Sequence, residues 1–519
     1  MKKLCAVLVA AGVLLSASAC APSEPEAASS PGTTTKGTAA PPKGTKPTKR
    51  GPNIVRILTD DQDINSLAVM KKTLSLLGAT GTIYKDSVVS LSLCCPARAT
   101  LLTGQYAHNH HVWDNGGNTG GYLHFDNADN SLAPWLKKAG YQTAHVGKYM
   151  NGYGKSQVKE IPKGWDSWFN IVDEDRESYP YYGYTISDNG TSRTYGKADE
   201  DYVTDVFTDR AVSDVKTMAA SGKPFFLDFW PTAPHTGNGR VPTKHLGPAP
   251  GPQYENANPG AQAPRTENWL PEKNEIPEGL QVFGELYRAA NGGVKNFPQL
   301  IDDSYRDYLN SLLSVDDAVE RLVNELKAAG QLENTVIIFT SDNGLMWGNH
   351  GLANMKWEPY EESLRVPLII SGPGFPKGVT VDQPVGNIDI APTILALAGA
   401  PAGRTMDGRS LLPVTPKAPG KDRAILIESN LYDPAKPYQF PGDGVPRFKG
   451  VRGGGFQYTE WADGTVELFD LEKDLAEMHN VAEDPRFADD KAKLKEALGK
   501  LNNCAGPACN VDVVGLTHP

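Results

Sequence analysis

Short apolar runs of the kind that form buried strands recur along the chain: Asn53–Leu58, Tyr141–Val146, Pro224–Trp230, Thr335–Thr340 and Val366–Ile370. Helical patterns lie between them, and the clearest covers Tyr305–Ala329, with Gly330 after its last turn. Strands that alternate with helices predict an α/β fold, in which a large, mixed but mainly parallel sheet lies between helices. The length of 519 residues leaves room for a second, smaller domain.

Polar side chains follow two of these runs directly. Asp60 and Asp61 come after the first run, and Asp342 and Asn343 come after the fourth. Each pair alone is common in ordinary loops and turns, but ligands of α/β sheets gather beyond the carboxyl ends of the strands. Since these side chains offer only oxygen donors, they predict one hard divalent cation, Ca²⁺ before Mg²⁺.

The segment after the first predicted strand holds the sequence CCPARATLLTG, which starts at Cys94. A buried thiol pair or half of a disulfide is the simplest interpretation of Cys94 and Cys95. Vicinal cysteines rarely bridge each other, however, and no Cys-x-x-Cys metal spacing is present. We expect Cys95 to be a small buried thiol.

The pattern Cys-x-Pro-x-Arg, formed here by Cys94, Pro96 and Arg98 and followed by Leu102-Thr103-Gly104, resembles the signature of type I sulfatases. In that family the first cysteine is oxidised to formylglycine, an aldehyde that hydrates to a geminal diol. One hydroxyl attacks the sulfate ester and the other later expels sulfate, so that one difficult step becomes two easier ones. The resemblance therefore implies a sulfuric ester hydrolase that depends on a formylglycine-generating enzyme.

The resemblance extends from about residue 52 to 480 and implies the alkaline-phosphatase-like fold of the sulfatases. It also implies a set of metal ligands, namely Asp60, Asp61, Cys94, Asp342 and Asn343. The implied catalytic residues are Cys94, Arg98, Lys148, His235 and Lys356. In the family, the arginine binds the formylglycine, the histidine lies near the leaving oxygen, and the second of the two lysines holds the sulfate. Cationic groups around a sulfate are physically reasonable, because charge stabilisation is usually the largest catalytic contribution.

One position departs from the family pattern. Many sulfatases have a histidine two residues after the lysine that matches Lys148, whereas this chain has Met150. That histidine is the usual candidate base for the elimination step, which leaves His145 or His350 as possible substitutes. The segments CCPAR, LLTGQYAHNHHV, GKYMNGYG and SLLSVDDAVERLV resemble N-acetylglucosamine-6-sulfatases and extracellular heparan 6-sulfatases.

Substrate recognition is expected from two loop segments, 105–125 and 236–300. The second is rich in Pro, Gly and Asn, and it predicts a long insertion with aromatic side chains, among them Trp269, Phe283, Tyr287 and Phe297. Aromatic faces with interspersed polar groups suit a sugar ring. The histidines of the first segment, His108, His110 and His111, are interpreted as substrate contacts or packing rather than as metal ligands.

The N-terminal residues predict export. Lys2 and Lys3, an apolar stretch and Ala17-Ser18-Ala19 form a signal peptide over residues 1–19. Cys20 follows, so the chain is expected to be either a cell-surface lipoprotein, anchored through a lipid on Cys20, or a secreted protein. Residues 20–51 predict a disordered linker, 52–415 the catalytic domain and 416–519 a domain with an antiparallel sheet and a helix. In that last domain, Cys504 and Cys509 predict a disulfide.

The predicted function is hydrolysis of a sulfate ester on a small molecule or oligosaccharide, with a sulfated amino sugar or glycan as the expected substrate. One alternative is a broad arylsulfatase. A phosphoesterase of the same superfamily would more often carry Ser or Thr in place of Cys94. Another alternative is a non-catalytic, glycan-binding lipoprotein in which Cys94 is unmodified. The net charge of −10 gives no indication of nucleic-acid binding.

Overall fold

The structure is a computed structural model that describes residues 51–519 except 127, 174–178, 238–246, 273–279, 281–295, 415–421 and 430–446. The predicted signal peptide and nearly all of the predicted linker lie outside these residues, as do Phe283 and Tyr287. Residues 50–519 form one compact unit. The predicted boundary at 415/416 falls in a segment outside the description and stays a prediction.

A ten-stranded mixed sheet forms the centre of this unit, in the order β13-β2-β12-β9-β1-β8-β4-β5-β6-β7. The five neighbours β9, β1, β8, β4 and β5 run parallel, while β12, β6 and β7 join antiparallel. The strands are β1 Asn53–Thr59, β2 Thr82–Tyr84, β4 Gln142–Gly147, β5 Ser167–Ile171, β6 Thr185–Asp188, β7 Thr191–Thr194, β8 Phe225–Trp230, β9 Thr335–Ser341, β12 Leu368–Ser371 and β13 Val379–Val381.

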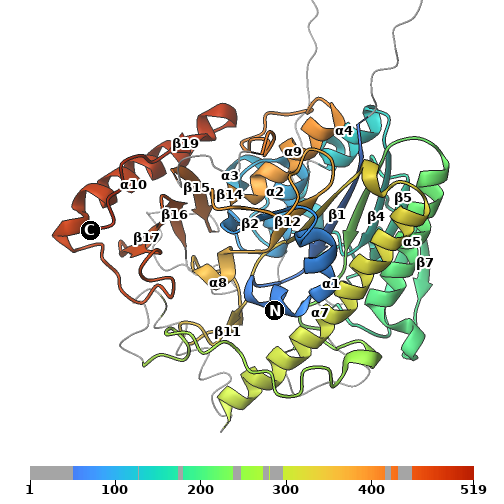
Figure 1. Cartoon of the computed structure of the whole chain (residues 1–519), viewed down its shortest axis with the longest axis horizontal. Helices are drawn as coiled ribbons and strands as arrows, with labels where there is room; N and C mark the ends of the chain where they lie inside the picture. The colour runs from blue at the N-terminus through green and yellow to red at the C-terminus, as the bar shows by residue number, and fades with distance from the viewer. Residues whose placement is uncertain are drawn as a thin grey trace, which may run out of the picture. The chain divides into compact units, whose positions relative to one another are not determined.

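Alternate side chains of β1 enter two separate hydrophobic cores, as the two-residue period of a strand requires. Val55 and Ile57 pack with α5 (Val203–Ala220) and α7 (Phe297–Ala328), which lie side by side in Figure 1. Ile54 and Leu58 pack with α2 (Cys94–Thr103), α4 (Leu132–Lys138) and α9 (Ile390–Ala398) on the other face. The predicted sheet between two helical layers is therefore confirmed.

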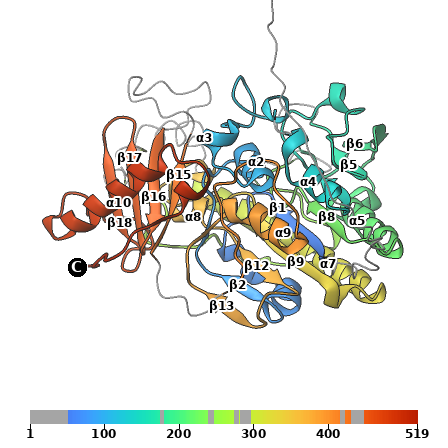
Figure 2. The ribbon, with the colours of Figure 1, turned by 90° about the horizontal axis from the view of Figure 1, so that it is seen from above.

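A second, five-stranded antiparallel sheet has the order β18-β17-β16-β15-β19 and packs against α10 (Figure 2). Its elements are β15 Arg423–Glu428, β16 Phe448–Gly453, β17 Phe456–Trp461, β18 Val466–Asp470, α10 Ala488–Leu501 and β19 Val511–Asp512. The predicted disulfide joins Cys504 and Cys509. This smaller α+β region matches the predicted C-terminal architecture.

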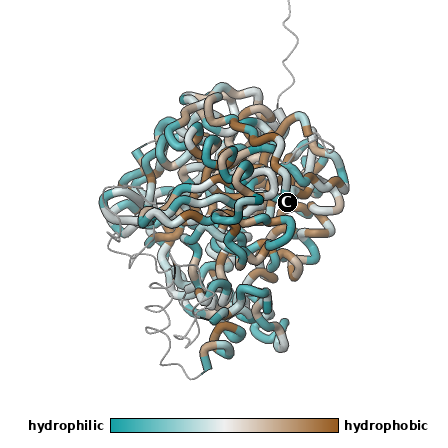
Figure 3. Tube along the Cα trace, turned by 90° about the vertical axis from the view of Figure 1, so that its left-hand side faces the viewer, coloured by the Kyte–Doolittle hydropathy of each residue, from teal (hydrophilic) through white to brown (hydrophobic). Residues whose placement is uncertain are grey.

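The remaining helices and strands are short: α1 Lys71–Thr73, β3 Ser87–Val88, α3 Ala107–His110, β10 Met346–Trp347, β11 Ala353–Met355, α8 Glu361–Leu364 and β14 Val385–Gly386. Hydrophilic and hydrophobic residues alternate along the outer helices (Figure 3), as expected for helices with one buried face. In the described part of the chain, no helix has both the length and the apolar character needed to span a bilayer.

All five predicted strands of the central sheet are confirmed within two residues, but α7 begins at Phe297 rather than near Tyr305. The apolar pattern in fact extends in front of Tyr305, because Phe297, Leu300 and Ile301 stand at helical spacing, and Pro298 lies in the first turn, where a helix tolerates proline. The last residues of the predicted 236–300 insertion therefore belong to α7. Trp269 in that insertion anchors its own loop, since Nε1 donates to Trp347 O at 3.0 Å.

Candidate active site

Four neighbouring parallel strands bring most of the predicted site residues to one edge of the sheet. Asp60 and Asp61 follow β1, Lys148 follows β4, and His235 lies in the loop after β8. Asp342 and Asn343 follow β9. Because β9, β1, β8 and β4 run parallel, their carboxyl ends meet at this edge.

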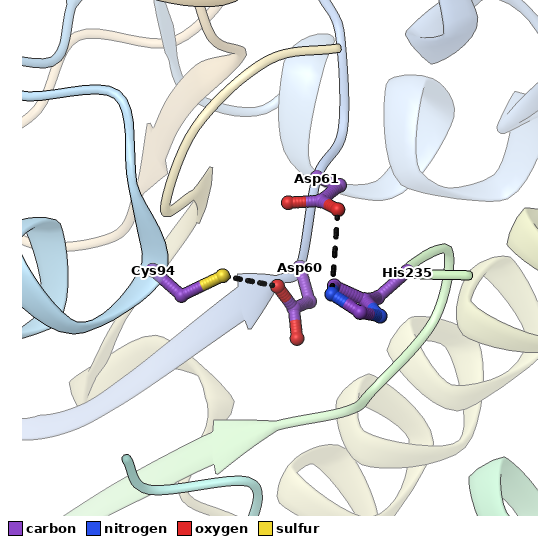
Figure 4. A group of neighbouring side chains, drawn as sticks. All are labelled: Asp60, Asp61, Cys94 and His235. Carbon is purple, nitrogen blue, oxygen red and sulfur yellow. Dashed lines mark hydrogen bonds and ion pairs between the residues drawn. The ribbon is translucent and has the colours of Figure 1, made fainter. Parts of the chain in front are cut away.

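Cys94 is the first residue of α2 and is fully buried opposite the end of β1. Its Sγ lies 3.4 Å from Asp60 Oδ1, 3.2 Å from Lys356 Nζ and 3.7 Å from Lys148 Nζ. Figure 4 shows the Cys94 side chain pointing toward Asp60, with Asp61 and His235 beside them. Burial and the Asp60 carboxylate raise the pKa of the Cys94 thiol well above its usual value.

Each buried carboxylate of the site contacts a cationic side chain. Lys148 Nζ lies 2.5 Å from Asp60 Oδ2, and Lys356 Nζ lies 2.5 Å from Asp61 Oδ1.

The third buried carboxylate, Asp342, pairs with Arg98, which binds Asp342 Oδ2 at 2.8 Å. Arg98 also lies 3.4 Å from Asp60 Oδ2. Its Nη1 also donates to the main-chain oxygen of Lys148, and the guanidinium lies over the Trp230 ring at 5.0 Å from the centroid. The guanidinium therefore connects α2 with the ends of β1, β4 and β9.

Three observations show that the residues fit a divalent cation. One donor atom from each of Asp60, Asp61, Cys94 and His235 lies within 4.8 Å of the others. The amide nitrogen of Asn343 donates to Asp61 Oδ1 at 2.6 Å, whereas its buried amide oxygen has no hydrogen-bond partner. Burial and the neighbouring Asp60 carboxylate raise the pKa of Asp342 to about 7, and a cation beside both carboxylates would offset this effect.

The charge count also favours a cation. Three carboxylates (Asp60, Asp61 and Asp342) face three cationic side chains (Arg98, Lys148 and Lys356), so the group is balanced before any anion enters. A sulfate ester would add a buried negative charge. With a bound divalent cation, the whole group would carry a net positive charge, and this charge would stabilise the sulfate ester.

Two backbone positions at the site have left-handed conformations. Asp61 has φ 67°, which is uncommon for a residue other than glycine and is typical of functional sites. Gly147, the last residue of β4, has φ 128°, and a Cβ there would lie 1.9 Å from Trp230 O. Glycine is therefore required at this position, where the chain turns to present Lys148.

The histidines singled out by the sequence lie in different surroundings. His235 is the histidine grouped with Asp60, Asp61 and Cys94; its Nε2 lies 3.6 Å from Asp61 Oδ2, and burial lowers its pKa to about 4. His145 is enclosed by aromatic rings, and its Nε2 lies 3.3 Å from Asn170 Oδ1.

The histidines that follow α2 support packing rather than catalysis. His108 binds Glu428 and the Cys504 carbonyl oxygen, and His110 lies 3.0 Å from Thr100 Oγ1. His350 belongs to a separate buried group, described below. Cys95 is buried as expected, and its Sγ accepts a hydrogen bond from Asn151 N at 3.2 Å.

Two aromatic residues at the site were not predicted. The Tyr179 ring lies under Lys148 Nζ, at 4.4 Å from the centroid, and makes an edge contact with His235. The Trp230 ring lies under Arg98. Trp230 ends an apolar strand next to a predicted site loop, which is a usable signal, whereas nothing in the sequence around Tyr179 marks it.

Comparison with known proteins identifies the class to which this fold and site belong. The family model described as Sulfatase matches residues 52–400, and the model described as N-sulphoglucosamine sulphohydrolase, C-terminal, matches residues 348–504. A solved structure described as a complex with the substrate D-glucosamine-2-N,6-O-disulfate has a TM-score of 0.70 at 23% identity, covering 88% of this chain and 98% of that one. This chain is a sulfuric ester hydrolase.

Curated proteins with similar sequences are also sulfatases. N-acetylglucosamine-6-sulfatase of Homo sapiens is 34% identical over 498 residues, which cover 89% of this chain and 86% of that protein. The arylsulfatase of Volvox carteri is 31% identical over 509 residues, covering 88% of this chain and 75% of that protein. The chain belongs to the sulfatase family.

Proposed function

We propose that this protein hydrolyses sulfate esters on amino sugars or related glycans, using a formylglycine made from Cys94 and one bound Ca²⁺. The observation that carries this proposal is the position of Cys94. Its buried Sγ, at the start of α2, has Asp60, Lys148 and Lys356 within 3.7 Å. A nucleophile at this atom would lie next to a metal-binding carboxylate and two ammonium groups.

Formylglycine would supply a hydrated aldehyde whose oxygens take the place of the Cys94 Sγ. Lys356 and Lys148 lie close enough to this place to stabilise an oxyanion and the sulfate oxygens. Arg98, fixed by Asp342 and the Lys148 carbonyl oxygen, adds a third positive charge that cannot be lost by deprotonation. These groups would stabilise charge without having to reorganise during the reaction.

The Ca²⁺ ligands would be Asp60, Asp61, Asp342, Asn343 and an oxygen derived from Cys94. Bound there, the cation would supply positive charge toward the sulfate and orient the nucleophile. Mg²⁺ is a weaker candidate, because the carboxylates come from separate loops rather than from a compact octahedral set.

His235 would exchange a proton with the leaving oxygen. Its Nδ1 lies 2.6 Å from the Thr236 carbonyl oxygen, which can only accept, so Nδ1 carries the proton and Nε2 faces the acidic residues. Lys148, whose Nζ donates to Asp60 Oδ2 at 2.5 Å, provides a second proton donor. The role of the histidine that Met150 replaces would then fall to one of these two side chains.

An amino-sugar substrate is supported by the relatives. N-acetylglucosamine-6-sulfatases match most of this chain, and the structural neighbour described with a glucosamine disulfate shares the fold. The test compares kcat/KM for glucosamine 6-sulfate, galactose 6-sulfate and a nitrophenyl sulfate. We expect the glucosamine ester to be preferred. Preference for the aryl ester by orders of magnitude would replace the proposal with a broad arylsulfatase.

The non-catalytic alternative is tested by the mass of the peptide that carries Cys94. Conversion of cysteine to formylglycine requires a formylglycine-generating enzyme as a transient partner and changes this mass. An unconverted peptide from an active preparation would contradict the proposed chemistry.

Export is the proposed localisation, with a lipid anchor on Cys20 or release from the cell as the two forms. Relatives described as extracellular sulfatases of Caenorhabditis elegans and Drosophila melanogaster are 38% and 36% identical over 371 and 386 residues. Fractionation of cells that express the chain or its Cys20→Ser variant distinguishes the two forms. Release of the variant, but not of the parent, would identify a lipoprotein.

A further inference from the structure

A second group of potential metal ligands lies at His350, Glu362 and Glu477. One donor atom from each residue lies within 4.8 Å of the other two, and the three residues are 0%, 8% and 1% exposed. His350 lies in the turn between β10 and β11, Glu362 in α8, and Glu477 in the segment after β18. Glu477, from a segment distant in sequence, therefore meets His350 and Glu362 at one buried point.

In each of these side chains, one polar atom has a hydrogen-bonding contact, while the other is buried and has no hydrogen-bond partner. Glu362 Oε1 accepts from Asn268 Nδ2 at 3.0 Å and from Asn349 Nδ2 at 2.8 Å. Glu477 Oε2 accepts from Glu361 N at 2.7 Å. The atoms without a partner are His350 Nδ1, Glu362 Oε2 and Glu477 Oε1.

Such buried atoms are rare in native proteins and costly unless a ligand satisfies them. The neighbouring N–H groups are also too few to satisfy every acceptor of the cluster. Asn268 Nδ2 contacts three groups, Glu362 Oε1, the Ala476 carbonyl oxygen and His350 Nε2, but it carries two hydrogens.

Negative charge exceeds positive charge around the cluster. Glu361 pairs with Arg365 at 2.6 Å and with Arg452 at 2.8 Å, and Arg452 also binds Asp86 at 2.9 Å. With Glu362 and Glu477, four carboxylates face two guanidinium groups, which leaves a charge of 2 − 4 = −2. A divalent cation would balance this charge, and proton uptake by the glutamates is the competing explanation.

We propose that His350, Glu362 and Glu477 bind a divalent transition-metal ion, Zn²⁺ before Mn²⁺, at a site separate from the catalytic one. One imidazole and two carboxylates form a donor set suited to Zn²⁺, whereas the all-oxygen set at the active site suits Ca²⁺. This inference does not depend on the proposed substrate or on conversion of Cys94, because none of the three residues belongs to the catalytic group.

The ion would fix the segment that presents Lys356. His350 lies in the turn that leads into β11, and Lys356 follows that strand directly. Ser363, next to Glu362 in α8, donates its hydroxyl to the Lys356 carbonyl oxygen. Metal binding would therefore hold both sides of this loop and attach them to the segment of Glu477.

Zinc stoichiometry tests the proposal. The full-length Asp61→Asn variant, whose catalytic cation site is impaired, is dialysed against Zn²⁺, desalted and measured by plasma mass spectrometry. We expect about one Zn²⁺ per chain, and expect Glu477→Gln in the same background to lose it. Glu467→Gln is the matched control, because Glu467 is also a buried glutamate but is not one of the three proposed ligands and accepts a hydrogen bond from Tyr360.

A second measurement leaves His350, Glu362 and Glu477 unchanged, so its result does not depend on whether the Glu477 variant folds. In Asp61→Asn, Zn²⁺ should raise the thermal midpoint, and X-ray absorption should show one imidazole among ligands at about 2.0–2.2 Å. Zinc that is absent from the folded Asp61→Asn chain, or retained equally after Glu477→Gln, would overturn the proposal. The cluster would then be a network of protonated carboxyl groups.

Discussion

Arg56 on β1 binds Asp228 on the neighbouring strand β8 through two hydrogen bonds, Nε to Oδ1 at 2.7 Å and Nη2 to Oδ2 at 2.6 Å. Both side chains are fully buried. The third donor of the guanidinium, Nη1, binds the Leu101 carbonyl oxygen in α2 at 2.9 Å. The pair therefore ties two central strands to the helix that begins with Cys94.

We predict that Arg56→Met destabilises the protein by about 3–5 kcal/mol, because it leaves the Asp228 carboxylate buried without its partner. Denaturant unfolding measures this loss. The double variant Arg56→Met/Asp228→Leu should lose clearly less than the sum of the single variants, since no unpaired charge remains. Exchange of the exposed pair Glu496–Lys500 serves as a control with little effect. Additive losses in the double variant would contradict this interpretation.

The two adjacent cysteines should respond differently to substitution. Cys94→Ala should abolish sulfatase activity, because this side chain is the proposed formylglycine precursor. Cys95→Ser should keep much of the activity, since its Sγ contacts Asn151 rather than the carboxylates and lysines of the site. Assays with a glucosamine sulfate and peptide masses measure both effects. Full activity of Cys94→Ala would exclude the proposed nucleophile.

The sequence predicted the elements with a strong apolar pattern and the side chains that directly follow them. Asp60 and Asp342 could be placed at one edge because parallel strands bring their carboxyl ends together. Strand β7, Thr191–Thr194, was not predicted because it is an exposed edge strand without an apolar face. The pairing of Arg56 with Asp228 was within reach, because each is an isolated charge inside an apolar strand and burial demands a partner.

Other parts of the site depended on tertiary contacts that no local pattern encodes. Lys356 contacts Cys94 from the end of the hairpin formed by β10 and β11. Tyr179 contacts Lys148 from a loop. Their positions follow from the packing of distant segments. For Lys148, His235 and Lys356 the family resemblance supplied what residue spacing alone could not.

Gly147 should tolerate no side chain. In Gly147→Ala, the new Cβ would meet the Trp230 carbonyl oxygen, and alanine strongly disfavours φ 128°. We expect a loss of stability of roughly 2–4 kcal/mol and a lower kcat, because the following residue, Lys148, is displaced. Gly140→Ala is the matched control, since Gly140 also has positive φ but its Cβ would meet no atom within 4 Å. An equal loss of kcat in both variants would contradict a role for Gly147 in placing Lys148.

Chelation should abolish activity, and Ca²⁺ should restore it better than Zn²⁺, because the protein ligands of the catalytic site are hard oxygens. Asn343→Leu keeps the side-chain volume but removes the amide oxygen that has no partner. We expect this variant to need a much higher Ca²⁺ concentration for half-maximal activity. Calcium titrations of the chelated wild type and variant measure the shift. Recovery with Zn²⁺ alone would exclude the proposed calcium site.

The pair His108–Glu428 should make stability depend on pH. Burial lowers the pKa of His108, but the hydrogen bond to Glu428 Oε2, with a distance of 3.0 Å, outweighs burial and leaves this pKa raised above 6.5. Because the folded pKa exceeds that of the unfolded chain, the stabilisation is fully present below about pH 6.5 and is lost as pH rises through the folded pKa. Unfolding free energies of the wild type and His108→Gln, measured between pH 5.5 and 8.5, should therefore converge as pH rises. His479→Gln controls for an exposed histidine. A difference that stays constant across this range would show that His108 contributes only as a neutral hydrogen-bonding group.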